Sequence, residues 1–321
     1  MDFKEVGFSM FGIPTFAKSK QVAISDSWTS DVAVLGVPFD QGTGFRSGTR
    51  HGPKHVRDWS IRYSHITAPG SPGYWDMRTQ GNRARCSIVD CGDVDILPLV
   101  WEDNFKRISE SVQGILSHKS MPIILGGDHS VTFPNVSAFT DHGPITVVQF
   151  DAHADYRDEV LGVRYGHGNV LRRVRELPFV EKIINIGLNG YKQREVDLRA
   201  HKADGNDIVH AFEIHDNPPE YFLSRLPAGK NVYITFDIDV FDASVAPGTG
   251  TPEPGGLTYV QVRRFLDRLC RTNNIVGMDL VEVNPLYDPS FITALTAVHV
   301  IIDVLGVLFP GSDEATSSRK Q

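Results

Sequence analysis

The stretch ITVVQFDAHAD, residues 145–155, joins an apolar run to a charged run at a single point in the chain. Its first part, Ile145–Phe150, is rich in β-branched and aromatic residues, which is typical of a buried β-strand. Its second part places Asp151, His153 and Asp155 two residues apart, and in an extended chain such side chains project to the same side. The stretch therefore predicts a buried strand that ends in a group of metal-ligating side chains.

Seven further apolar runs of strand length accompany this one. The eight predicted strands are Asp31–Val37, Ser87–Cys91, Pro122–Leu125, Ile145–Phe150, Lys182–Ile186, Ile208–Phe212, Val232–Phe236 and Ile275–Leu280. Helices are expected between them, for example over Asn104–His118, Thr258–Cys270 and Phe291–Leu308. Apolar strands that alternate with helices are typical of a parallel sheet covered on both faces. The pattern predicts an α/β protein with three layers, α-β-α, around a central, mostly parallel eight-stranded sheet.

We expect a single catalytic domain over residues 31–310. Residues 1–30 contain the breaker Gly12-Ile13-Pro14 and are predicted to form an irregular arm. Residues 311–321, GSDEATSSRKQ, are small and polar and are predicted to be a frayed tail.

The composition argues against several classes of protein. Of the 321 residues, 41% are hydrophobic and 22% are charged, so a sizeable core is expected. The formal net charge of -7 offers no general attraction to nucleic acid or to anionic membranes. The three cysteines are too few for a disulfide framework and fit a reducing compartment. With no signal-peptide pattern and no long apolar run, we expect a cytoplasmic protein with no nucleic-acid or membrane partner.

Three other predicted strands are followed by residues of the same chemical kind. Gly126–Ser130 (GGDHS) follows the third strand, Asp237-Ile238-Asp239 the seventh and Glu282–Pro285 (EVNP) the eighth. Ligands collect beyond the carboxyl ends of parallel strands, so these residues are expected at one edge of the sheet. Each motif alone has an ordinary alternative, because a single Asp often caps a helix and GGDHS also fits a turn with a cap.

Several carboxylates at one edge need concentrated positive charge. A buried carboxylate costs several kcal/mol unless it is paired or bound to metal. Two divalent cations about 3.5–4 Å apart supply that charge and can hold a bridging water as hydroxide. A ligand set rich in oxygen with two imidazoles suits Mn(II), with Ni(II), Zn(II), Co(II) and Fe(II) as alternatives.

These motifs resemble the signatures of the ureohydrolase family, which includes arginases, agmatinases and guanidinobutyrases. The matching segments are Gly126–Ser130 (GGDHS), Phe150–Asp155 (FDAHAD), Phe236–Asp242 (FDIDVFD), Pro247–Pro252 (PGTGTP) and Glu282–Pro285 (EVNP). The resemblance runs from about Gly12 to about Pro310, and Gly12–Phe16 (GIPTF) and Val34–Asp40 (VLGVPFD) look like the agmatinase and guanidinobutyrase branch. It implies an arginase-like fold and a hydrolase that cuts a guanidino compound to urea and an amine.

The resemblance also implies a ligand set for two cations, Mn(II) first and Ni(II) as the alternative. One cation would be bound by His129, Asp151, Asp155 and Asp237. The other would be bound by Asp151, His153, Asp237 and Asp239, so that Asp151 and Asp237 bridge the pair.

Four residues would act on the substrate if the resemblance holds. Asp155 would orient the bridging hydroxide that attacks the guanidinium carbon. Glu282 would accept hydrogen bonds from the guanidinium, and His167 would return a proton to the leaving amine. Thr251 is expected to line the same pocket.

The loop after the DAHAD motif departs from the family pattern. Residues 156–166 lack the Asn and Ser typical of arginases, which disfavours arginine as substrate. The run after His167 is Gly-Asn-Val-Leu where agmatinases usually have Gly-Thr-Met-Phe. Arg157 and Arg164 would suit a substrate carboxylate, or equally be solvated charges. Agmatine and 4-guanidinobutanoate are the leading substrates, and free guanidine, a substituted guanidine or a biguanide is the alternative.

Two rival hypotheses concern the activity itself. A formimino-amino-acid hydrolase would use the same metals and release formamide. A non-catalytic partner subunit of a ureohydrolase complex would be expected to have lost ligands, which this chain retains. The related deacetylases share the general fold but use one zinc. The family resemblance further implies a homotrimer or a homohexamer.

Overall fold

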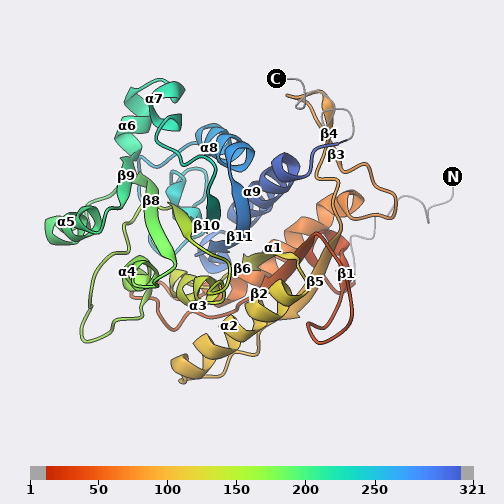
Figure 1. The fold of residues 1–321 in the computed structure, drawn as a ribbon, viewed down its shortest axis with the longest axis horizontal. Coiled ribbons are helices and arrows are strands. Elements are labelled where there is room, and N and C mark those ends of the chain that lie inside the picture. The colour runs from red at the N-terminus through yellow and green to blue at the C-terminus, as the bar shows by residue number, and fades with distance from the viewer. Residues whose placement is uncertain (1–11, 312–321) are drawn as a thin grey trace.

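The predicted strands pair side by side in one sheet in the computed structural model, which describes residues 12–311 (Figure 1). All strand pairs in this sheet are parallel. In spatial order its nine strands are β1 (Lys20–Gln21), β5 (Ile88–Asp93), β2 (Val32–Gly36), β6 (Met121–Leu125), β11 (Asn274–Val281), β10 (Asn231–Asp237), β7 (Ile145–Phe150), β8 (Val180–Leu188) and β9 (Asp207–His210).

Helices cover both faces of the sheet, because successive strand residues point to opposite sides. Val32 and Val34 belong to one hydrophobic core, whereas Ala33 and Leu35 belong to the other. The first core is closed by α1 (Gly52–Ser60), α6 (Ala211–Asp216), α7 (Pro219–Leu223), α8 (Tyr259–Thr272) and α9 (Ile292–Leu308). The second is closed by α2 (Trp101–Ser117), α3 (Thr132–Ser137), α4 (Val170–Arg175) and α5 (Glu195–Ala203). The three-layer α/β architecture expected from the sequence is confirmed.

The sheet has one strand more than the eight that the sequence predicts. The additional strand, β1, lies within the segment expected to be an irregular arm, and it pairs with β5. Both of its residues are exposed, so no apolar pattern marks it. Nearby, Phe16 and Ala17 are buried, and Phe16 N donates to Asp90 Oδ2 at 2.7 Å. Residues 1–11 of that arm, and the expected tail from residue 312 on, lie outside the described residues.

One predicted strand ends too late. The run Ile208–Phe212 was predicted to be extended, but β9 ends at His210 and Ala211 begins α6. Glu213 accepts a hydrogen bond from the backbone N–H of His210, which is half of a capping box that starts the helix. The predicted helix Asn104–His118 begins three residues earlier, at Trp101, whereas α8 and α9 agree with the prediction to within two residues.

Smaller elements complete the fold. A hairpin of β3 (Tyr74–Asp76) and β4 (Gly81–Arg83) forms a separate antiparallel sheet. Short 3-10 helices are η1 (Phe16–Lys18), η2 (Thr49–His51), η3 (Ile61–Ile66), η4 (His129–Val131), η5 (His167–Asn169), η6 (Ile238–Val240) and η7 (Pro285–Tyr287). No helix within residues 12–311 is both long and apolar enough to cross a membrane.

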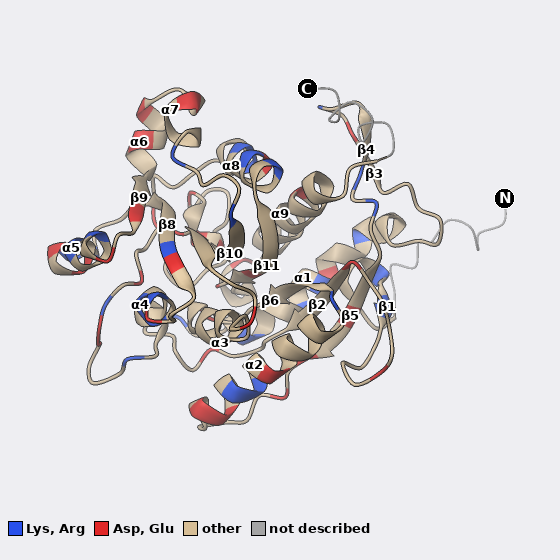
Figure 2. Cartoon of the chain, viewed as in Figure 1, with Lys and Arg blue, Asp and Glu red and all other residues tan. Residues whose placement is uncertain are grey.

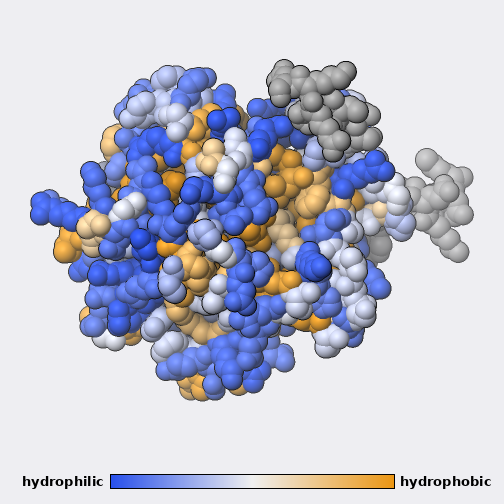
Figure 3. Space-filling model, viewed as in Figure 1, coloured by the Kyte–Doolittle hydropathy of each residue, from blue (hydrophilic) through white to orange (hydrophobic). Residues whose placement is uncertain are grey.

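Charged and hydrophobic residues occupy different parts of the fold. Lysine, arginine, aspartate and glutamate mark the outer helices α2, α5 and α8 and several loops (Figure 2). On the face in Figure 3, hydrophilic residues cover most of the rim, and hydrophobic residues show between them near the centre.

The strand order decides where a site can form. β6, β11, β10 and β7 are consecutive in the sheet although they are far apart in the chain. These are the four strands whose carboxyl ends carry the motifs singled out in the sequence. The fold therefore brings the four motifs to adjacent positions on one edge.

Candidate metal centre

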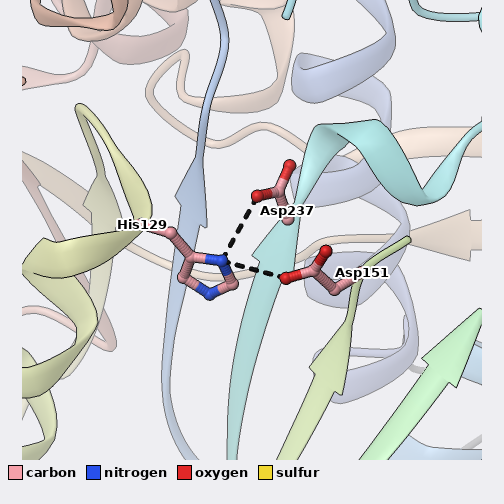
Figure 4. A group of neighbouring side chains, drawn as sticks. All are labelled: His129, Asp151 and Asp237. Carbon is pink, nitrogen blue, oxygen red and sulfur yellow. Dashed lines mark ion pairs between the residues drawn. The ribbon is translucent and has the colours of Figure 1, made fainter. Parts of the chain in front are cut away.

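The carboxyl ends of neighbouring strands contribute the candidate ligands. His129 follows β6, Asp151 follows β7, and Asp237 ends β10. Figure 4 shows these three side chains pointing toward one another from separate elements. They are at most 3% exposed, so the group is buried within the protein.

Local turns, and not an extended chain, aim the aspartates of the paired motifs. The chain bends after Phe150, and His153 N donates to Asp151 Oδ1 at 2.5 Å. After β10, Asp239 N donates to Asp237 Oδ1 at 2.9 Å, and Asp239 lies on η6. Asp151 and His153 do come together as predicted, but through a turn and not through strand alternation. Each aspartate instead accepts from the amide two residues on, as in an Asx turn.

His129 lies at the centre of the group. Its Nδ1 lies 3.0 Å from Asp151 Oδ2, 3.1 Å from Asp155 Oδ2 and 3.2 Å from Asp237 Oδ2. The close approach of its loop depends on Gly127, where a Cβ would lie 1.7 Å from the carbonyl oxygen of Phe39. One imidazole nitrogen carries at most one proton, so it cannot donate to three carboxylates at once.

Two overlapping groups of potential ligand atoms result. The first contains His129, Asp151 and Asp237, and the second contains Asp151, His153 and Asp239. Asp151 is common to both, and it is one of the two positions at which the family resemblance implies a bridging carboxylate. Asp237, the other predicted bridge, belongs to the first group only, and its Oδ1 is occupied by the Asp239 amide.

Asp155 approaches the first group through its contact with His129. Its backbone has φ 47°, in the left-handed region that non-glycine residues rarely adopt. Glu282 is also left-handed, with φ 63°. Such conformations persist only where the surrounding structure holds them, and they concentrate at functional sites.

The charges of the group are unbalanced without a cation. Burial, and then repulsion by Asp239 and Asp151, raises the pKa of Asp237 well above its ordinary value. Burial lowers the pKa of His129, but the three carboxylates around it outweigh burial and raise that pKa well above its ordinary value. The group therefore attracts positive charge, which protons or divalent cations can supply.

A hydroxyl lies behind the distal nitrogen of His129 and a carboxylate behind that of His153, which favours metal ligation by both histidines. Nε2 of His129 lies 2.9 Å from the hydroxyl of Thr235 on β10, which leaves Nδ1 as a free lone pair when Nε2 carries the proton. Nδ1 of His153 lies 3.1 Å from Asp239 Oδ2, while its Nε2 lies 3.5 Å from Glu253 Oε1. A carboxylate or hydroxyl behind the distal nitrogen is the usual arrangement of a metal-binding histidine. With this oxygen-rich donor set, the residues fit two divalent cations.

Glu282 and His167 form a second cluster beside the first. Oε1 of Glu282 accepts from His129 N at 3.0 Å and faces His167 Nδ1 at 3.2 Å. Oε2 is buried and has no hydrogen-bond partner within residues 12–311. A buried carboxylate oxygen without a partner is costly, so it is available to a donor that enters the site.

His167 is held on both ring nitrogens. The amide of Gly44 donates to its Nε2 at 3.0 Å, which selects the tautomer with the proton on Nδ1. Burial lowers the pKa of His167, but the hydrogen bond and charge of Glu282 outweigh burial and raise that pKa to about 9. The two contacts favour different protonation states of His167. Glu282 stabilises the doubly protonated ring, whereas the hydrogen bond from Gly44 needs Nε2 without a proton.

The remaining predicted residues line one cavity of about 810 Å³. Thr251 lines it and donates to Asp239 Oδ2 at 3.1 Å. Arg157 and Arg164 line it too, but Arg164 is 3.1 Å from Asp158 and 3.6 Å from Glu176. His153, Asp155, His167 and Asp237 face the same cavity, so it connects the candidate ligands to solvent.

Two residues of the site were not singled out from the sequence. Asp128 caps η4 and also accepts from Gly42 N at 2.7 Å, so it holds the loop that brings Gly44 to His167. Glu253 supports His153 from a loop about a hundred residues away in sequence. The GGDHS motif marked Asp128 as a cap, but no local pattern indicates the partner of either residue.

The sequence and fold match proteins of one family. The arginase family model matches residues 30–306. The chain is 34% identical over 287 residues to the guanidinobutyrase of Pseudomonas aeruginosa, covering 88% of this chain and 87% of that protein. It is 37% identical over 287 residues to the mitochondrial agmatinase of Gallus gallus, covering 88% and 82%. Proclavaminate amidino hydrolase from Streptomyces clavuligerus superposes with a TM-score of 0.82 at 29% identity, covering 93% of this chain and 98% of that one.

Proposed function

The chain belongs to the arginase family, and from that premise we propose that it is a binuclear metal hydrolase which cuts a guanidino compound to urea and an amine. The observation that carries the proposal is that the cluster of candidate metal ligands lies next to the cluster of Glu282 and His167. Five histidine and aspartate side chains form two overlapping groups of potential ligands, and Asp155 contacts His129 of the first group. Oε2 of Glu282, which has no hydrogen-bond partner within residues 12–311, lies beside them. A guanidinium is planar and rich in N–H donors, which suits such a carboxylate.

The proposed ligands follow the sequence prediction. His129, Asp151, Asp155 and Asp237 would hold one cation, and Asp151, His153, Asp237 and Asp239 the other. Mn(II) is the proposed ion and Ni(II) the alternative. When bound, such a pair of cations would supply the Lewis acidity that lowers the pKa of a water molecule toward neutrality.

The protein's own groups account for binding and proton transfer. Glu282 would accept the guanidinium N–H groups through Oε2 while its Oε1 stays on His129 and His167. Asp155 would accept a hydrogen bond from the attacking water and fix its direction. His167, which faces the cavity and contacts Glu282, would donate a proton to the nitrogen of the departing amine. Thr251 would line the pocket and keep Asp239 in place.

Agmatine and 4-guanidinobutanoate are the proposed substrates. The names of the relatives support this choice, since the matched proteins include a guanidinobutyrase and agmatinases. We also propose that the protein acts in the cytoplasm as a homotrimer or homohexamer, and light scattering on the purified protein would test the oligomeric state.

The proposal is tested by metal content and product together. Metal-stripped protein is reloaded with Mn(II) or Ni(II), and bound metal is measured by elemental analysis. Each form is then given agmatine, 4-guanidinobutanoate, arginine, guanidine, a biguanide and a formimino-amino acid, and urea and formamide are quantified. We expect two ions per chain and urea from a guanidino compound with a carbon tail. Formamide from a formimino-amino acid, with no urea from any compound, would overturn the proposal. So would a protein that binds two ions and releases neither product.

A further inference from the structure

The cavity above the candidate ligands has two ends of opposite charge. At its buried floor lie Asp155 and Asp237, which belong to the ligand cluster. Toward the exposed mouth, the charged lining residues are Arg157, Arg164 and Lys192, together with Asp197, which is buried on α5. Among the described residues that line the mouth, three cations therefore face a single carboxylate.

Most of the mouth charges already have partners. Arg194 binds both oxygens of Asp197, at 2.6 and 2.7 Å, and Arg157 Nε is 3.9 Å from the same carboxylate. Arg164 is turned toward Asp158, 3.1 Å away, which does not line the cavity. Lys192 has no carboxylate within ion-pair distance in residues 12–311, and its Nζ lies 5.5 Å from the centre of the Phe45 ring.

The position of Lys192 is built by contacts from two other loops. Arg157, in the loop after β7, donates from its Nη2 to the carbonyl oxygen of Lys192 at 3.1 Å. Next to it, Gln193 donates to the carbonyl oxygen of Ala152 at 3.4 Å. Phe45, on the other end of the Lys192 side chain, belongs to the loop after β2 and is 67% exposed. The lysine thus starts at the loop after β8 and extends along the mouth toward the loop after β2.

We infer that this pocket takes guanidino acids, with the guanidinium at the floor and the substrate carboxylate bound by Lys192 at the mouth. The inference rests on the proposed function and chooses between its two substrates. A zwitterion such as 4-guanidinobutanoate places each charge at the end of opposite sign. Agmatine carries an ammonium group that would face Arg157 and Lys192, and like charges repel. Free guanidine has no tail to reach the mouth.

An aromatic ring is a weak partner for an exposed ammonium group, and a carboxylate is a stronger one. Lys192 would therefore leave Phe45 for the substrate without breaking an ion pair. Arg157 acts as a positioning residue, because its guanidinium holds the backbone of Lys192.

The decisive experiment compares two substrates on two variants. Urea release from 4-guanidinobutanoate and from agmatine is measured with the wild-type protein, Lys192→Met and Lys202→Met. Lys202 is an exposed lysine on α5 that does not line the cavity, so its variant loses the same charge elsewhere. We expect wild type to prefer the acid. Lys192→Met should raise KM for the acid roughly tenfold, the usual size of a lost charge-assisted hydrogen bond, and should improve agmatine turnover. Lys202→Met should match wild type on both substrates.

The dependence of KM on ionic strength distinguishes an electrostatic role of Lys192 from a structural role. An exposed ion pair is screened by salt, so KM for the acid should rise between low and high salt in wild type and stay flat in Lys192→Met. Lys192→Glu should reverse the preference toward agmatine.

The outcomes separate the two proposals. Equal KM for the acid in wild type and Lys192→Met, or a wild-type preference for agmatine, overturns the carboxylate assignment and leaves guanidino hydrolysis intact. Absence of urea from every guanidino compound overturns the proposed function itself.

Discussion

The floor and the mouth of the pocket are built in different ways. The floor and the candidate ligands next to it follow the ends of adjacent strands and are mostly buried, whereas the cations of the mouth lie on the loops after β7 and β8. The candidate ligands have several partners each, as Asp151 does with His129, Gln149 and the amide of His153. Lys192 at the mouth has one weak aromatic contact. Under the proposed function, the chemistry would depend on the core of the fold, while substrate choice would depend on loops that can change without disturbing it.

The largest effect is expected from Asp151, the aspartate that both ligand groups share. Asp151→Asn keeps a side-chain oxygen for the turn but removes the charge shared by both ligand groups. We expect metal content to fall and kcat/KM to drop by about a thousandfold or more, because a group that acts in a concerted site has a large, non-additive effect. The control is Asp288→Asn, an equally buried aspartate in a similar turn outside the cluster. If Asp151→Asn turns over normally, the ligand assignment is wrong.

A smaller effect is expected from Glu282, which lies beside the candidate ligands. Glu282→Gln removes the charge that would bind the guanidinium, and we expect kcat/KM to fall roughly a hundredfold while bound metal stays unchanged. The check is a steady-state assay paired with elemental analysis. Loss of metal from this variant would mean that Glu282 supports the ligand cluster instead of the substrate.

The same variant should shift the pH profile. A histidine that donates a proton is active below its pKa, and the pKa of His167 is raised to about 9 mainly by Glu282 acting against burial. In wild type, activity should therefore be lost as the pH rises through about 9. In Glu282→Gln that alkaline limb should move to lower pH, because the carboxylate that stabilises the imidazolium is gone. An alkaline limb at the same pH in both proteins would exclude His167 as its origin.

Removing a residue that supports a candidate ligand should have a smaller effect than removing the ligand itself. Glu253→Gln removes the carboxylate 3.5 Å behind His153, and we expect metal affinity to fall about tenfold. Activity should return at higher metal concentration, as titration with Mn(II) would reveal. An affinity equal to that of wild type would show that Glu253 only packs against Gly190, where it also lies close.

The smallest effect is expected from the mouth residue that already has partners. Arg164→Met removes a cation 3.1 Å from Asp158, and we expect KM for 4-guanidinobutanoate to change by less than about twofold, as for most exposed ion pairs. Lys192→Met, measured beside it, should change the same KM about tenfold. Equal effects of both variants would mean that the mouth acts through its total charge and not through Lys192.

Much of the floor could be predicted from residues 145–155 and their three companion motifs. Apolar runs of strand length and helical stretches between them are local properties, and they correctly indicated eight strands in a parallel, three-layer fold. The same reasoning missed β1, whose two exposed residues carry no pattern, and ran one strand into α6, where a capping interaction of Glu213 starts a helix. It also attributed the direction of the aspartate ligands to strand alternation, whereas side-chain turns at Asp151 and Asp237 produce it.

The sequence by itself determined which candidate metal-ligating motifs the protein contains and that each motif follows a strand. Only the tertiary structure decided that β6, β11, β10 and β7 are neighbours, so that His129 meets Asp237 across a separation of about a hundred residues. It also decided that Arg164 is paired while Lys192 lacks a carboxylate in the described part of the chain. The reason is physical. Hydrophobic period and turn chemistry act over a few residues, whereas strand order and ion pairing depend on contacts between distant segments that form only when the sheet is assembled.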